Sequence, residues 1–251
     1  MRNNRSKCKK QWFSNACQNK GIHMNYNELV KLLRENSDEK YNRFNAAIVN
    51  SSVPTMGVRL PTVRKIAKSV TVDEALSYPV HEYLEVDTIV GIVLSSAKLP
   101  FEEKSALLTK FAQTIENWSV CDCNTVKVPK AERKQYFQFF KSMLPSAMPF
   151  VCRYGVVNLL ANYLDDEYIN AVFDSLQSIV SYGHYYVDMA VAWLVATAAA
   201  KCRDVTFAYL VGDGKRVLNV FTYNKALQKM RDSYRISDED KAATYALKRS
   251  D

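Results

Sequence analysis

The sequence predicts an all-α protein, and three observations support that prediction. Only 7 glycines and 7 prolines occur among 251 residues, so the turn formers that a many-stranded fold needs are scarce. Apolar residues recur at helical spacing from about residue 25 to the end of the chain. Hydrophobic residues make up 48% of the sequence, which excludes a disordered chain and is sufficient for a folded core.

Each expected helix follows from this spacing and from local start signals. Pro61 suits a first helical turn, where a missing N–H costs nothing, and Asn117 and Ser237 are suitable N-cap residues. Short connections predict that neighbouring helices run antiparallel. The expected helices cover residues 25–36, 39–50, 61–70, 86–98, 100–115, 117–122, 130–141, 147–164, 166–180, 185–201, 205–210, 222–233 and 237–249.

Two stretches resemble each other, which suggests an internal repeat. Residues 147–180 and 185–210 each form an expected helical hairpin. The two hairpins share a rhythm of apolar, small and aromatic side chains, which is compared at residues 156–159 and 191–194. This pattern indicates HEAT-like repetition, and a globular helical bundle is the alternative interpretation.

The charge of the chain is concentrated at its beginning. The formal net charge is +8 and the sequence pI is about 9.1, yet residues 1–20 contain six basic residues and no acid. A basic arm can follow phosphates, although such ends commonly only improve solubility. Since no internal linker is visible, we expect a loosely ordered arm at residues 1–23 and a single HEAT-like domain at residues 24–251.

Several classes of protein are excluded by what the sequence lacks. The six cysteines form no C-x-x-C pair, which is typical of a reduced, cytoplasmic protein. Three histidines make a zinc site improbable, and no phosphate-binding or dinucleotide-binding loop is present. No apolar signal segment opens the chain. We therefore expect a cytoplasmic protein without metal, cofactor or membrane association.

Trp118 and Asp122 form the most informative pair of side chains. They lie four residues apart, so they share one face of a helix. A carboxylate beside a flat aromatic ring suits a cationic, aromatic or electron-poor ligand. In the alternative interpretation, Trp118 fills the core while Asp122 caps a helix or pairs with a neighbouring arginine.

Two further residues stand out within apolar helices. Arg153 needs a partner because a buried, unpaired charge is costly. That partner is either Asp122 or a phosphate in a groove, unless the guanidinium simply reaches water at the edge of a buried face. Trp193 is surrounded by small residues, so it either wedges into the core or stands in a cleft.

Basic residues gather in two other segments. Lys225 and Lys229 lie one helical turn apart, and such a row can contact successive phosphates. A charge run of this kind is also commonly a solvated face. The two groups are Arg59, Arg64, Lys65 and Lys68, and then Lys215, Arg216, Lys225, Lys229, Arg231 and Arg235.

Five segments in order give the chain a family resemblance. They are residues 56–61 with 64–68, 117–118 with 121–122, 150–153 with 156–157, 185–187 with 189–193, and 221–226 through 234–235. In order and spacing they resemble the DNA alkylation repair family of AlkD-like, HEAT-repeat proteins. The resemblance covers about residues 25–249, nearly the whole chain.

The resemblance implies a right-handed α-α superhelix, or solenoid, with a basic concave face for duplex DNA. It implies a monomeric DNA glycosylase that releases cationic alkylated purines of the 3-methyladenine or 7-methylguanine type. The catalytic residues implied are Trp118, Asp122 and Trp193. The resemblance also implies that Arg153 binds phosphate, and the two basic groups add Arg59, Lys65, Lys225 and Lys229 as candidate DNA-binding residues.

Two departures from the family pattern leave the activity open. Glycosylases of the family have a fuller helical segment before the residue that corresponds to Gly57, whereas Pro54 disfavours a helix here. Residues 194–197 also lack the arginine that active members often place after the second tryptophan. The alternative is therefore a non-catalytic HEAT-like scaffold that binds DNA or protein. An open cleft shared by Trp118, Asp122 and Trp193 would favour the enzyme.

Overall fold

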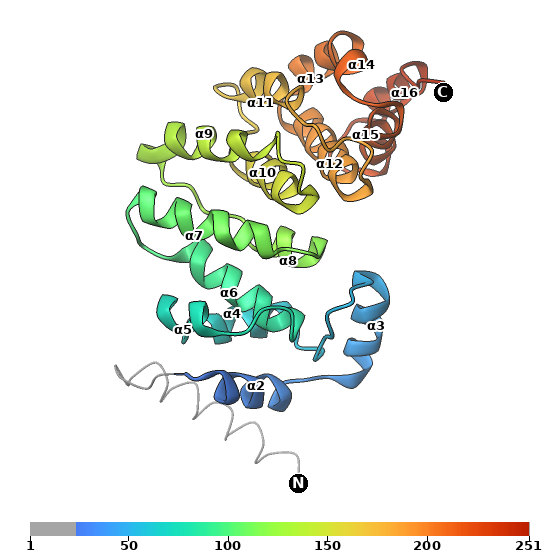
Figure 1. The fold of residues 1–251 in the computed structure, drawn as a ribbon. Coiled ribbons are helices and arrows are strands. Elements are labelled where there is room, and N and C mark those ends of the chain that lie inside the picture. Colours follow the sequence, from blue (N-terminus) through green and yellow to red (C-terminus); the bar gives the residue numbers. More distant parts are fainter. Residues whose placement is uncertain (1–23, 251) are drawn as a thin grey trace. The chain divides into compact units, whose positions relative to one another are not determined.

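The computed structural model describes residues 24–250, and this part of the chain is all-α, as predicted (Figure 1). Among these residues there are helices and connecting segments and no strand. The predicted basic arm at residues 1–23 lies outside the described residues. The right-handed superhelix implied by the family resemblance stays a prediction.

Two compact units divide at Lys98 and Leu99. The prediction of one domain is not decided by this division, because neighbouring parts of a repeat array also contact mainly themselves. The core of the first unit includes the fully buried Leu29, Leu33 and Ile66. Its helices are α2 (Tyr26–Glu35), α3 (Glu39–Val49), α4 (Leu60–Ala67), α5 (Val72–Ser77) and α6 (Leu84–Ser96).

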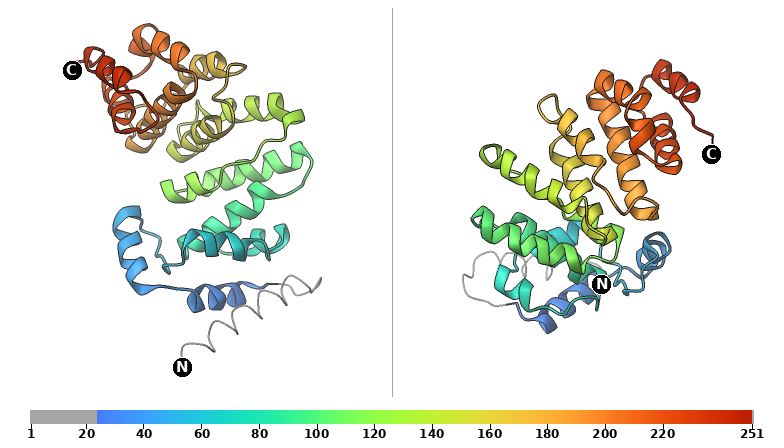
Figure 2. Two further views of the ribbon diagram at one scale, coloured as in Figure 1. Left: turned by 180° about the vertical axis from the view of Figure 1, so that it is seen from behind. Right: turned by 45° about the horizontal axis from the view of Figure 1, so that its top comes forward.

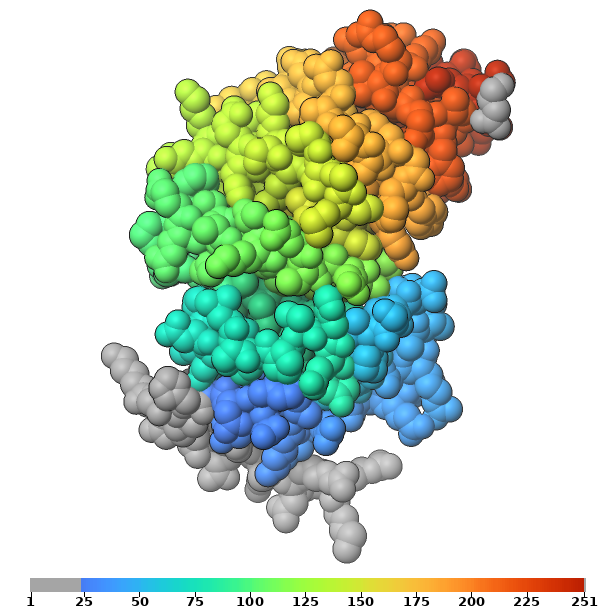
Figure 3. All heavy atoms as spheres, viewed as in Figure 1, coloured from blue at the N-terminus to red at the C-terminus, as the bar shows by residue number. Residues whose placement is uncertain are grey.

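The second unit contains the remaining helices, and Figure 2 shows them from two further directions. They are α7 (Phe101–Thr114), α8 (Trp118–Cys123), the 3₁₀ helix η1 (Lys130–Glu132), α9 (Arg133–Met143), α10 (Pro149–Asn162), α11 (Ile169–Leu176), α12 (Tyr185–Lys201), α13 (Arg203–Val211), α14 (Gly214–Val217), α15 (Val220–Asp232) and α16 (Asp238–Ala246). More than half of the residues of helix α12 are buried, because the helix packs against both α10 and α15. Side chains close the spaces between these ribbons (Figure 3).

Most helices lie where the apolar spacing predicts them, and two short ones were not predicted. Helix α5 begins with a capping box, in which Thr71 accepts from the Glu74 amide while Glu74 accepts from the Thr71 amide. The Thr-x-x-Glu spacing therefore predicts the start of this helix. The apolar pattern does not, because the helix has only about one and a half turns. Helix α14 has only four residues.

The segment before Arg59 forms no helix, as Pro54 predicted, and a buried carboxylate holds it in place. Glu85 of α6 accepts hydrogen bonds from the amides of Met56, Gly57 and Val58 at 2.8–3.1 Å. Gly57 has φ +76°, and a Cβ atom there would come within 2.5 Å of Asn42 Cβ. Only glycine fits this position without displacing α3.

Among the described residues, no helix combines the length and the apolar character that crossing a bilayer requires.

Candidate functional site

Trp118 and Asp122 lie on helix α8, whose start is capped by a side chain. The Asn117 side chain accepts a hydrogen bond from the Ser119 amide at 2.8 Å, which confirms the predicted cap. Val120 and Cys121 face the interior, so the opposite side of this short helix reaches the surface. Trp118 is half-buried, and the side chain of Asp122 is 16% exposed.

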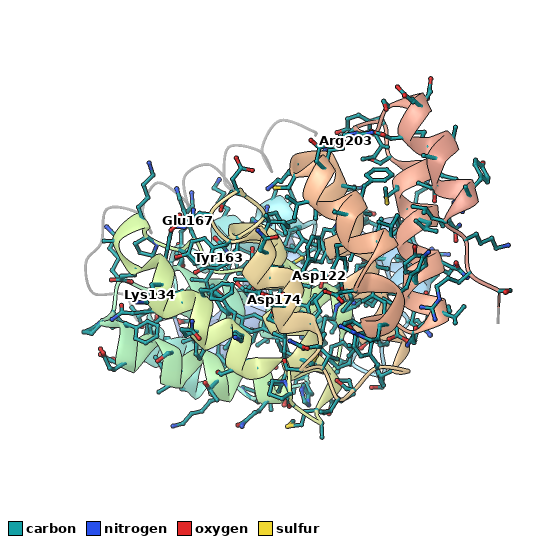
Figure 4. The ribbon with its side chains drawn as sticks, turned by 90° about the horizontal axis from the view of Figure 1, so that it is seen from above. Asp122, Lys134, Tyr163, Glu167, Asp174 and Arg203 are labelled. Carbon is teal, nitrogen blue, oxygen red and sulfur yellow. The ribbon has the colours of Figure 1, made fainter. Side chains whose placement is uncertain are left out.

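Asp122 is held by Arg153 of α10 in a two-point ion pair. Arg153 Nε donates to Asp122 Oδ1 at 3.0 Å, and Nη2 donates to Oδ2 at 2.7 Å. Nη1 donates to the carbonyl oxygen of Tyr186, in the first turn of α12. The pair thus joins α8, α10 and α12, and Asp122 is labelled in the view from above (Figure 4).

This geometry decides between the partners that the sequence left open for Arg153. Its side chain is only 6% exposed, and Asp122 supplies the opposite charge that burial requires. In this structure protein groups engage the guanidinium. A phosphate contact by Arg153 stays a prediction.

Burial and pairing act on Asp122 in opposite directions. Burial raises the pKa of the Asp122 carboxyl above its ordinary value, while the hydrogen bonds and positive charge of Arg153 lower it. Burial has the larger effect, so the net pKa is raised. The result is a carboxylate with a fixed orientation whose charge is sensitive to its surroundings.

Trp193 stands in a groove and is not a core wedge. It is 38% exposed on α12 and lines a groove of about 390 Å³. Ala196, Thr197 and Ala200, small residues of the same helix, line the groove with it. The residues that line it are Trp193, Ala196, Thr197, Ala200, Lys229, Asp232, Ser233, Tyr234 and Arg235.

Lys229 connects this groove with the ion pair. Burial lowers the pKa of the Lys229 ammonium, and the nearby positive charges of Arg153 and Lys225 lower it further, whereas Asp232 opposes the change. An interaction with Arg153 places Lys229 near the Asp122–Arg153 pair, and the same side chain lines the Trp193 groove. The ion pair thus joins α8, α10 and α12, and Lys229 of α15 lies near it. Trp118, Asp122 and Arg153 are not among the residues that line the Trp193 groove, so one cleft shared by all the predicted site residues stays a prediction.

A family model described as DNA alkylation repair enzyme matches residues 29–230, from α2 to α15. The chain belongs to the DNA alkylation repair enzyme family. The match covers most of the chain and confirms the resemblance seen in the five ordered segments. No curated protein matches the sequence.

Lys225, the other predicted DNA contact on α15, lies beside a different groove. Lys225 Nζ donates to Gln228 Oε1 at 2.9 Å and lies 5.8 Å from the centre of the Phe221 ring. It lines a groove of about 370 Å³ together with Arg231 and Lys248. Lys248 was not among the predicted contacts, because it is separated from α15 along the sequence.

Two predicted contacts belong to the first unit. Arg59 forms an ion pair with Asp38 at 3.3 Å, and its guanidinium lies 4.5 Å from the centre of the Tyr41 ring. Its side chain is nevertheless 62% exposed, so it reaches solvent. Lys65 is exposed on α4. The sequence analysis did not single out Tyr234 of the Trp193 groove, whereas Arg235 of the same groove belongs to the second basic group.

Within residues 24–250, no three or more His, Cys, Asp or Glu side chains are grouped so that they could hold a metal ion.

Proposed function

We propose that this member of the DNA alkylation repair enzyme family is a DNA glycosylase. It would hydrolyse the N-glycosidic bond of cationic alkylated purines, of the 3-methyladenine or 7-methylguanine type, in duplex DNA. The observation that supports this most is Asp122, a carboxylate that Arg153 holds in one orientation by two hydrogen bonds. Family membership supports DNA alkylation repair as the broader function.

The proposed chemistry needs one carboxylate and no general acid. An alkylated purine already bears a positive charge, so it leaves with the bonding electron pair and becomes neutral. The deoxyribose then carries oxocarbenium character, which the negative charge of Asp122 would stabilise. Water adds to C1′ and loses its proton to Asp122 or to solvent, which leaves an abasic site. Arg153 is assigned to positioning Asp122.

The test is release of methylated base from alkylated duplex DNA by the purified protein. We expect wild-type protein to release 7-methylguanine or 3-methyladenine faster than the spontaneous reaction does. A preparation of Asp122→Asn, made in the same way, controls for contaminating glycosylases. If wild type and Asp122→Asn release base at the same rate, the proposed activity is wrong.

Trp193→Ala is expected to slow excision about two- to thirtyfold, while Trp193→Phe should lose less. A partly desolvated ring interacts with a cation by about 0.5–2 kcal/mol, and removal of the ring forfeits that interaction. Val211→Ala is the matched control, because Val211 is an exposed large side chain on α13 of the same unit. Excision by Trp193→Ala at the wild-type rate would remove Trp193 from the site.

DNA affinity is expected to fall about a hundredfold between about 50 and 200 mM salt if about four phosphates are neutralised. The proposed contacts are Arg59, Lys65, Lys225 and Lys229, all of which have side chains that are exposed or half-buried. Replacing one of them by glutamine should reduce the slope of log affinity against log salt by about one. Affinity that is independent of salt would contradict a phosphate-binding surface.

A second candidate function is favoured by one observation. Both oxygens of Asp122 accept from Arg153, so the charge that catalysis needs is partly neutralised. A non-catalytic, HEAT-like DNA-binding scaffold would be consistent with this pairing. DNA binding with the salt dependence above, combined with no base release, would support that function.

A further inference from the structure

Five aromatic side chains form a continuous row at the starts of three helices of the second unit. The row consists of Phe150 of α10, His184, Tyr185 and Tyr186 of α12, and Phe221 of α15. We name these five residues the ring row. His184 is the N-cap of α12, and the other four lie in the first turns of their helices.

The spacing of the rings shows that each contacts the next. The ring centres lie 5.3 Å apart for Phe150 and Tyr186, 5.4 Å for Tyr185 and Tyr186, and 6.2 Å for Tyr185 and Phe221. His184 lies 6.0 Å from Tyr186 and 6.4 Å from Phe150. Because rings from three helix starts touch, α10, α12 and α15 must begin on the same side of the unit.

Much of the ring row faces solvent. Tyr185 is 57% exposed and Phe221 is 40% exposed, which leaves large aromatic surfaces without a covering group in this unit. An aromatic ring stabilises the fold when it is buried, so core packing does not explain why these two rings are exposed. Exposed aromatic groups of this size commonly mark binding sites.

Charge and position indicate what binds there. The ammonium of Lys225 lies 5.8 Å from the centre of the Phe221 ring at one end of the row. Near the other end, the carbonyl oxygen of Tyr186 accepts from Arg153, which holds Asp122. Aromatic rings beside a cation are the usual means of binding unpaired nucleobases, since the rings stack on the bases and the cation attracts phosphate. Bases within a duplex offer no free faces for such stacking.

We propose that the ring row binds unpaired bases of a DNA strand that continues from a duplex. The site would give this protein a preference for alkylated DNA next to single-stranded regions. The proposal rests on DNA as the partner of the proposed function, but it does not depend on catalysis. Neither Tyr185 nor Phe221 is assigned a part in the excision step.

The experiment compares a fluorescein-labelled duplex with the same duplex bearing a single-stranded tail of about eight nucleotides. Wild-type protein should bind the tailed DNA more tightly than the blunt duplex. Tyr185→Ala and Phe221→Ala should each weaken binding to the tailed DNA about fivefold or more, with little effect on the blunt duplex. Tyr185→Phe retains a ring and should retain the preference.

The matched control is Tyr245→Ala, since Tyr245 is a 68% exposed aromatic residue of the same unit outside the ring row. Melting temperatures of all variants show whether each is folded. Equal wild-type affinity for blunt and tailed DNA would overturn the proposal, as would equal losses on both DNAs in the alanine variants. Self-association of the wild type that a variant carrying both Tyr185→Ala and Phe221→Ala loses would also overturn the proposal, because the row would then join two copies of the chain.

The outcome can be separated from that of the proposed function. Base release from fully paired, alkylated duplex tests the glycosylase, whereas the effect of the tail on affinity tests the ring row. If the wild type releases base but binds both DNAs equally, the glycosylase proposal stands and the ring-row proposal is wrong. If the wild type prefers tailed DNA but releases no base, the ring-row proposal stands and the glycosylase proposal is wrong.

Discussion

Asp122→Asn is expected to reduce base excision about 100- to 1000-fold while DNA affinity stays close to that of wild type. The substitution keeps the shape of the side chain but removes the negative charge that stabilises a cationic sugar. Loss of a comparable electrostatic interaction in a transition state costs about 3–4 kcal/mol. Excision kinetics and DNA titration on one preparation measure both quantities. Asp174→Asn, at an exposed position of α11, is the matched control.

The ion pair makes the same substitution destabilising, so a second variant is needed. Removal of one partner from a buried pair costs about 3–5 kcal/mol, because the other charge is left unpaired. Asp122→Asn should therefore lower the melting temperature. Asp122→Asn combined with Arg153→Met removes both charges and should restore most of the stability, since Met fills a similar volume. Excision should stay lost in the double variant. Wild-type excision by that stable double variant would show that Asp122 has no catalytic role.

The raised pKa of Asp122 predicts how excision depends on pH. The reaction needs the ionised carboxylate, so its rate should fall as pH is lowered through the pKa of Asp122. Because burial outweighs Arg153 and raises this pKa, the fall should begin above the pH expected for an ordinary aspartate. The contribution of Asp122 to the free energy of unfolding changes with pH in the opposite direction. A raised carboxyl pKa favours the folded state at low pH, and this contribution is lost as the pH rises. A rate that is flat through this range would argue against Asp122 as the titrating group.

Glu85→Ala is expected to destabilise the first unit by about 3–5 kcal/mol, which is a large effect for one residue. Three amides, those of Met56, Gly57 and Val58, would lose their acceptor in a buried segment. Glu85→Gln keeps one acceptor oxygen and should cost about half as much. Urea unfolding monitored by circular dichroism measures the change in the free energy of unfolding.

The same substitution should also affect the proposed DNA contact of Arg59, which directly follows the segment that Glu85 holds. We expect Glu85→Ala to weaken DNA binding even where the protein is still folded, because Arg59 loses its fixed starting position. Glu35→Ala, at the exposed end of α2, is the matched control and should change the free energy of unfolding by less than about 0.5 kcal/mol. A Glu85→Ala protein as stable as wild type would show that the three amides find other partners.

The helices could be predicted from sequence because their signals are local. The prediction for residues 185–201 matches α12, and the caps at Asn117 and Ser237 were recognised from single residues. Each signal depends on side chains within about one or two helical turns. Helices α5 and α14 were missed because they are too short to show a recurring spacing of apolar residues.

The sequence by itself determined the all-α class, the family resemblance and the shared face of Trp118 and Asp122. Tertiary structure alone decided that Arg153 pairs with Asp122 across 31 positions, and that Trp193 lines a groove instead of filling the core. The ring row also appeared only when the starts of three helices came together. Helical periodicity acts over a few residues, whereas the choice of an ion-pair partner or an exposed ring depends on which helices pack side by side. That packing joins segments far apart in the chain, and local spacing contains no record of it.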